Sequence, residues 1–111
     1  MKAVKMKLTQ YGYANDPYMD SYTAKGLGAY HNLEKGVSCA LTDSAKSAIG
    51  ATKRCWVRIT FASGGSMVRR YDDRAPESDN RCDLYMPGGF DHGLPDYATV
   101  EVTSAPVFVT K

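Results

Sequence analysis

Short runs of alternating apolar and polar residues, separated by glycine- and proline-rich turns, limit this chain to a fold built from strands. The clearest run is residues 54–61 (RCWVRITF), where every second side chain from Cys55 to Phe61 is apolar. A period of two residues is typical of a strand that buries one face. No segment carries a convincing helical period longer than two turns. The pattern therefore predicts an all-β fold.

Turn signals and further alternating runs extend this pattern along the chain. Residues 62–65 (ASGG) form a turn that joins the strand at 54–61 to another at 66–71, which gives a hairpin. The other predicted strands are residues 5–13, 37–42, 81–85 and 97–103, with 106–109 as a candidate for a last edge strand. This many short strands in 111 residues predict one barrel or sandwich domain that spans residues 1–111.

Two segments interrupt the strand pattern. Residues 44–49 (SAKSAI) read as a short helical turn, with Asp43 as its N-cap and Gly50 at its end. Residues 14–36 hold Asn, Asp, Pro and three glycines among several tyrosines, which indicates a long ordered loop. Loops of this length in a compact domain are usually functional.

The charge balance argues against a polyanionic partner. The chain has 14 basic and 12 acidic side chains, and the basic ones are scattered. We therefore expect no nucleic-acid binding. No run of about 18 apolar residues is present, so no membrane span is expected. The first residues lack the apolar segment of a signal peptide, so a periplasmic, cell-envelope or extracellular location is expected only if a leader was removed.

Three cysteines set the limits for covalent and metal chemistry. Cys39, Cys55 and Cys82 form no C-x-x-C or Cys/His cluster, so neither a metal site nor a cofactor is expected. We expect them to be small buried residues. One disulfide in an exported protein, or Cys82 as a nucleophile, are the alternatives.

Acidic residues concentrate in the stretch 71–90 (YDDRAPESDNRCDLYMPGGF). Asp73 opens a predicted D-R-A-P turn, whereas Asp83 lies between Cys82 and Leu84 in a predicted strand. Burial of a carboxyl group raises its pKa, so Asp83 is the best candidate for a proton donor. We expect the other acidic side chains of this stretch, Asp72, Glu77 and Asp79, to be solvated. A calcium site is an alternative, although the spacing fits no EF-hand loop.

Four segments, in order between residues 11 and 85, carry a family resemblance. They are Y-G at 11–12 with T-A-K-G at 23–26, L-T-D at 41–43 with A-I-G at 48–50, D-R-A-P at 73–76, and R-C-D-L-Y at 81–85. The chain resembles the double-psi β-barrels of rare lipoprotein A and the three-aspartate domains. Related barrels are membrane-bound lytic transglycosylase A, expansins, barwin and the family-45 endoglucanases.

The resemblance implies a six-stranded double-psi β-barrel with short helical turns and a long loop in its N-terminal half. It implies a monomer that acts on cell-wall glycan, most of all peptidoglycan. By resemblance, Asp83 matches the acid/base of the transglycosylase, with Asp73 as a second carboxylate and Asp43 as a third. There are departures: residues 43–47 (DSAKS) lack the histidine of rare lipoprotein A, and Ala48 replaces a proline.

Glycan binding also needs flat apolar rings and polar groups for the hydroxyls. Tyr11, Tyr13 and Trp56 are the candidate rings, and Arg74 is the candidate polar contact. Structural roles stay open for the acids: Asp43 as a helix cap, Asp73 as a turn residue, and Asp83 as an ion-pair partner of an arginine. Two further functions also stay open, a non-catalytic, expansin-like carbohydrate-binding module and a protein-interaction module on the same scaffold.

Overall fold

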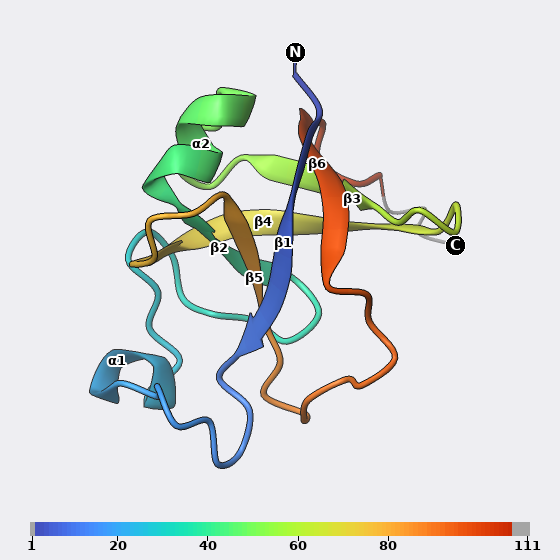
Figure 1. Ribbon diagram of the computed structural model, residues 1–111. Helices are drawn as coiled ribbons and strands as arrows, with labels where there is room; N and C mark the ends of the chain where they lie inside the picture. Colours follow the sequence, from blue (N-terminus) through green and yellow to red (C-terminus); the bar gives the residue numbers. More distant parts are fainter. Residues whose placement is uncertain (1, 108–111) are drawn as a thin grey trace.

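Six β-strands close into one barrel in the computed structural model, which describes residues 2–107 (Figure 1). Two short helices, α1 (Ser21–Ala24) and α2 (Asp43–Ile49), lie outside the barrel. The predicted all-β fold and its six-stranded barrel are confirmed. The strands are β1 (Val4–Tyr11), β2 (Ser38–Thr42), β3 (Trp56–Thr60), β4 (Ser66–Ala75), β5 (Arg81–Tyr85) and β6 (Tyr97–Thr103).

The strand pairing has an internal symmetry. The order around the barrel is β1-β5-β2-β4-β3-β6, with β1–β5 and β2–β4 parallel and the other pairs antiparallel. Exchanging β1, β2 and β3 with β4, β5 and β6 leaves every pair and its direction unchanged. The two halves of the chain therefore wind around the barrel in the same way. This topology is compatible with the double-psi barrel that the family resemblance implies.

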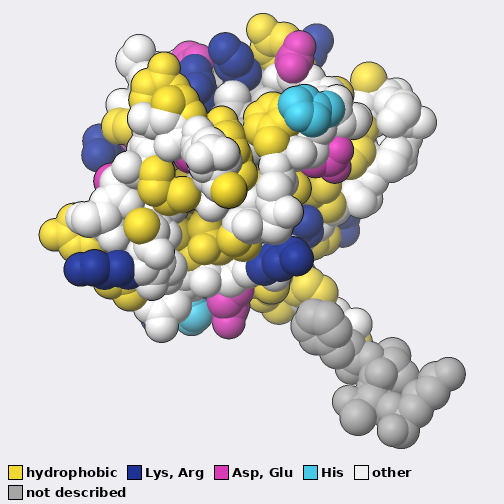
Figure 2. Space-filling model, turned by 90° about the horizontal axis from the view of Figure 1, so that it is seen from below, with side chains coloured by type: hydrophobic (Ala, Val, Ile, Leu, Met, Phe, Trp, Pro, Cys, Tyr) yellow, Lys and Arg dark blue, Asp and Glu magenta, His cyan; other side chains and the backbone are white. Residues whose placement is uncertain are grey.

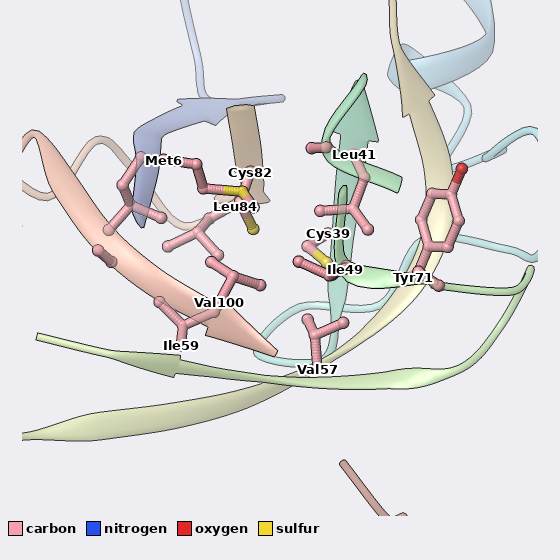
Figure 3. Close-up of a cluster of buried hydrophobic side chains, with 14 residues drawn as sticks. Met6, Cys39, Leu41, Ile49, Val57, Ile59, Tyr71, Cys82, Leu84 and Val100 are labelled. Atoms are coloured by element: carbon pink, nitrogen blue, oxygen red, sulfur yellow. The ribbon is translucent and has the colours of Figure 1, made fainter. Parts of the chain in front are cut away.

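The barrel interior is filled by the apolar faces of the strands (Figure 3). Val57 and Ile59 of β3 are completely buried, as their alternation predicts. Burial of one such side chain stabilises a fold by about 1.5–3 kcal/mol. Cys39 and Cys82 are completely buried in the same cluster, Cys55 is half-buried, and all three thiols are free. The prediction of buried cysteines is thus confirmed for Cys39 and Cys82.

Strand β4 is longer than predicted, and the expected D-R-A-P turn is wrong. β4 continues through Asp73 to Ala75, because its second half leaves β3 and pairs with β2. Cys39 pairs with Tyr71 and the next residue of β2 pairs with Asp73, so Asp72 is an extra residue on β4. Such a β-bulge bends a strand and changes the direction of its side chains. Asp73 is therefore a strand residue beside the bulge.

Asp72 itself was predicted to be solvated, and this prediction is wrong. Its side chain is completely buried and accepts hydrogen bonds from the Ser38 hydroxyl at 2.5 Å and from Arg70 Nε at 2.6 Å. Its backbone carbonyl accepts hydrogen bonds from the backbone amides of Tyr30 and His31, at 2.9 and 3.2 Å. The bulge therefore attaches the long loop to the barrel.

Helix α2 begins at Asp43, one residue earlier than predicted. Thr42 is the N-cap, and its hydroxyl accepts from the Ala45 amide at 3.3 Å, whereas Asp43 is the first helical residue. Gly50 ends the helix as predicted, with a φ of 70° that a residue without a Cβ adopts most easily.

The long loop and the described residues after β6 contain little regular structure. The long loop contains α1 and a bridge between Leu27 and Asn32. At the candidate edge strand, Pro106 and Val107 are not in a strand, and residues 108 and 109 lie outside the described residues. Across residues 2–107, neither helix has the length and apolarity that crossing a membrane requires.

Candidate active site

A cleft with a volume of about 940 Å³ lies against β1, β5 and the end of β4. This volume is in the range of small-molecule and cofactor sites. The loop after β1 and the loop before β6 complete its walls, and both lie below the barrel in Figure 1. Seen from below, hydrophobic side chains spread over the middle of this face, with charged side chains around its edge (Figure 2).

Hydrogen bonds of two side chains, one on β1 and one in the loop after it, hold both loops in place. Gln10 forms two hydrogen bonds with the backbone of Asp91, at 2.9 and 2.7 Å, which attach the loop before β6 to the strand. In the other loop, the Asp16 carboxylate accepts from the amides of Gly12 and Tyr18 at 2.9 and 3.0 Å. The two loops then meet through the rings of Tyr13 and Phe90, whose centroids are 5.2 Å apart.

Asp83 lies in this cleft, on β5, opposite Thr9 of β1. The Thr9 hydroxyl donates a hydrogen bond of 3.0 Å to its carboxylate. Burial raises the pKa of Asp83 to about 7, the nearby charge of Glu77 also raises it, and the Thr9 hydrogen bond lowers it. A carboxyl group with this pKa is about half protonated at neutral pH, so it can donate a proton there.

The expected alternative, an ion pair between Asp83 and an arginine, does not form among the described residues. Arg74 binds Asp43 instead, through two bonds of 2.9 and 2.8 Å. Arg81 binds Asp79 through two bonds of 3.0 and 2.8 Å and approaches Glu77 at 3.6 Å. Glu77 and Asp79 are therefore ion-paired, which corrects the prediction that they are simply solvated.

Asp73 also lines the cleft, but its oxygens are already occupied. It accepts hydrogen bonds from the Tyr11 hydroxyl at 3.1 Å, from the Ala29 amide at 3.0 Å and from the Arg74 amide at 2.9 Å. Burial and the charge of Asp73 raise the pKa of the Tyr11 hydroxyl far above its ordinary value, so it stays protonated and donates.

The contacts on β1 bring the two cleft carboxylates to the same side of that strand. Thr9 contacts Asp83 and Tyr11 contacts Asp73. Thr9 and Tyr11 are two residues apart, so they point to the same face and their Cα atoms are about 6.6 Å apart. Asp73 and Asp83 therefore approach neighbouring positions of one cleft wall.

Asp43 and Trp56 do not line the cleft, unlike the other candidate residues. Asp43 is an exposed residue of α2, and its bonds to Arg74 hold its pKa below the ordinary value. Trp56 lies on β3, where the Arg70 guanidinium is 5.6 Å from its ring centroid. Arg74 lines the cleft although its guanidinium is bound to Asp43.

Several cleft residues have no clear signal in the sequence. Thr9 is the exception, because it precedes Tyr11 by two residues and must share its face. Phe90 and His92, with ring centroids 4.8 Å apart, follow the irregular PGG segment, and no periodicity places them. Asp16 is one of several polar loop residues. Only the folded chain brings these residues beside Asp83.

Within residues 2–107, no group of three or more histidine, cysteine or acidic side chains is arranged to hold a metal ion.

Neither the protein-family models nor the curated proteins yield a match to this chain. Of the candidate residues, the structure collects five around one cleft: Asp83, Asp73, Tyr11, Tyr13 and Arg74.

Proposed function

We propose that this protein cleaves a cell-wall glycan of the peptidoglycan type, with Asp83 as general acid and then general base. The observation that carries the proposal is a carboxyl group with a pKa of about 7 on the wall of a 940 Å³ cleft. An acid whose pKa is near the working pH is available in both protonation states. Such a group suits a reaction that needs one proton delivered and one removed.

The surroundings of Asp83 favour a mechanism with a single carboxylate. Asp83 gives its proton to the glycosidic oxygen as the bond from that oxygen to C1 breaks. Its carboxylate then takes the proton of the C6 hydroxyl of the same sugar, whose oxygen bonds to C1. The product is a 1,6-anhydro sugar, as in lytic transglycosylases. A hydrolase needs a second free carboxylate, and Asp73 already accepts three hydrogen bonds.

The remaining cleft side chains have roles in binding the sugar. The rings of Tyr13 and Phe90 offer apolar faces on which sugar rings stack. The Thr9 hydroxyl orients the Asp83 carboxyl group. The symmetric strand pairing is compatible with a double-psi barrel, the fold that the resemblance to rare lipoprotein A implies. A protein with this activity works in the periplasm, the cell envelope or outside the cell.

The test is incubation with purified peptidoglycan, followed by mass spectrometry of the soluble products. We expect anhydro-muropeptides from the native protein and at least a hundredfold less from Asp83→Asn, because general acid–base catalysis contributes about 10²–10⁴-fold. Glu101→Gln is the control, since Glu101 on β6 and its ion-pair partner Arg58 both lie outside the cleft. Products of hydrolysis in place of anhydro sugars would contradict the mechanism, and equal activity of Asp83→Asn would exclude Asp83 as the acid.

A non-catalytic glycan-binding module is the second candidate. The observation in its favour is the segment 43–47 (DSAKS), which lacks the histidine that rare lipoprotein A carries there. Sedimentation of the protein with the wall, without soluble products, would identify this function. With neither products nor sedimentation, the protein-interaction module would become the leading hypothesis.

A further inference from the structure

The acidic side chains of this protein gather around the cleft, although the chain as a whole is basic. Among residues 2–107, which include all 12 acidic and 13 basic residues, seven acidic residues line the cleft but only three basic ones do. With Asp83 ionised, these seven negative and three positive charges give the lining a formal charge of −4. The other five acidic and ten basic residues of this range carry +5. The seven are Asp16, Asp20, Asp73, Glu77, Asp83, Asp91 and Asp96.

The positive charges of the lining are largely neutralised by their own partners. Arg74 is bound through both nitrogens to Asp43, which lies outside the cleft. Arg81 is bound in the same way to Asp79, also outside it. Lys7 is then the one cation of the lining for which the described residues provide no ion pair. A negatively charged ligand therefore meets little attraction here.

Hydrogen-bond acceptors in the cleft are also in excess over donors. Glu77 Oε2 is buried and has no hydrogen-bond partner among the described residues. This oxygen has no surface that a ligand could reach, whereas the Glu77 side chain as a whole is 33% exposed on the cleft wall. The charges of Glu77 and Asp16 both act on Asp83, and all three residues line the same cleft.

The aromatic side chains at the same place favour a cationic sugar. The rings of Tyr13 and Phe90 pack against each other in the cleft. Aromatic faces can stack on sugars and also attract ammonium groups. An ammonium group donates three hydrogen bonds and accepts none, which matches a lining of carboxylates. An N-acetyl group has one donor and no charge, so it leaves the negative charge of the cleft unbalanced.

We infer that the cleft selects glycan with free amino groups, that is, de-N-acetylated glucosamine units, over the fully N-acetylated form. The inference rests on the proposed glycan-binding function and names its substrate class. It assigns the recognition of the amino group to Glu77 and Asp96, whose side chains line the cleft. Asp83 keeps its role toward the glycosidic oxygen.

The inference is tested by calorimetric titration with two matched hexasaccharides, chitosan hexamer with free amines and fully N-acetylated chitin hexamer. Asp83→Asn is used for both, so that no ligand is cleaved, at pH 5.5 and low salt. We expect about tenfold tighter binding of the free-amine hexamer, because two or three charge pairs contribute about 0.2–1 kcal/mol each. Raising the salt to 0.5 M is expected to remove most of this difference.

Two further variants place the amino group in the cleft. Glu77→Gln and Asp96→Asn each remove one charge from the lining, and Asp96 is exposed, so its replacement is compatible with folding. Each is expected to reduce the preference for the free-amine hexamer by about threefold, and the double variant to abolish it. Glu101→Gln is the matched control, because it removes the same charge on β6, outside the cleft.

The outcomes separate the inference from the proposed function. Equal affinity for both hexamers overturns the inference and leaves glycan binding intact. A preference that Glu101→Gln reduces as much as Glu77→Gln overturns it as well, because the selection then comes from overall charge. A hexalysine peptide that binds as tightly as the free-amine hexamer would show that no sugar is recognised. Absence of binding to either hexamer contradicts the proposed function itself.

Discussion

Two opposing effects act on the carboxyl group of Asp83. Burial on β5 disfavours its negative charge, and the Thr9 hydroxyl, 3.0 Å away, favours it. Burial is the larger effect, so the pKa rises to about 7. Asp43 shows the opposite case, since it is exposed and bound to Arg74, and its pKa falls. Aspartates of one chain therefore differ in protonation because their surroundings differ.

The pKa of Asp83 makes a prediction about stability. The folded protein binds a proton at Asp83 up to about pH 7, whereas the unfolded chain releases it near 3.8. The stabilisation from this proton is complete below pH 3.8 and is lost as the pH rises to about 7. We expect Asp83→Asn to change the free energy of unfolding little at pH 4 and to raise it by about 2 kcal/mol at pH 8, half the full linkage value because the group is partly exposed.

Urea unfolding of Asp83→Asn and the native protein at several pH values measures this effect. Asp43→Asn is the control with the opposite sign, because an aspartate of lowered pKa stabilises the folded state at neutral pH and loses that effect in acid. A difference between Asp83→Asn and the native protein that stays constant from pH 4 to pH 8 would disprove the raised pKa.

At the scale of the elements, the bulge in β4 organises one side of the molecule. The extra residue Asp72 lets β4 change partner from β3 to β2 and directs its carboxylate into the interior. There it binds Ser38 at the start of β2 and Arg70 of β4. Arg70 also reaches Glu34 at 2.6 Å, so one guanidinium connects the strand with the long loop.

This arrangement predicts a large effect for Arg70→Leu. The substitution leaves the Asp72 carboxylate buried without its cation, and removing one partner of a buried ion pair costs about 3–5 kcal/mol. Arg58→Leu is the control, because Arg58 forms an exposed pair with Glu101 that is worth less than about 1 kcal/mol. Chemical denaturation of both variants gives the two values. Equal destabilisation by the two substitutions would contradict the role assigned to Asp72.

At the scale of the whole molecule, the closed barrel joins both halves of the chain. Each half contributes three strands, and all six strand pairs connect one half with the other. The cleft has the same origin, because β1 comes from the first half and β5 from the second. Neither half can form this site alone.

A barrel closed in this way predicts a single cooperative unfolding transition. Trp56 is the one tryptophan of the chain and lies on β3, which pairs with β4 and β6. Its fluorescence and the far-ultraviolet circular dichroism of all strands are expected to change at the same urea concentration. Two separate midpoints would show that residues 1–111 do not unfold as one domain.

The local pattern of the sequence predicts much of the fold. The strands at 81–85 and 97–103 and the buried face of β3 follow from alternation, because burying one face of a strand requires a period of two. The end of β4 does not follow from it. That strand continues because it pairs with β2, some 30 residues earlier in the chain, and no local signal reports a distant partner.

For the site, the sequence by itself determined that Asp83 is a strand residue between two apolar neighbours, and hence a candidate for burial. It also placed Tyr11 at the end of β1, whereas Tyr13, predicted to lie in the same strand, is in the loop after it. Only the tertiary structure decided that Asp72 is buried with a cation while Asp73 lines the cleft. The physical reason is that the pKa and the reach of a carboxylate depend on groups that other strands and loops bring to it.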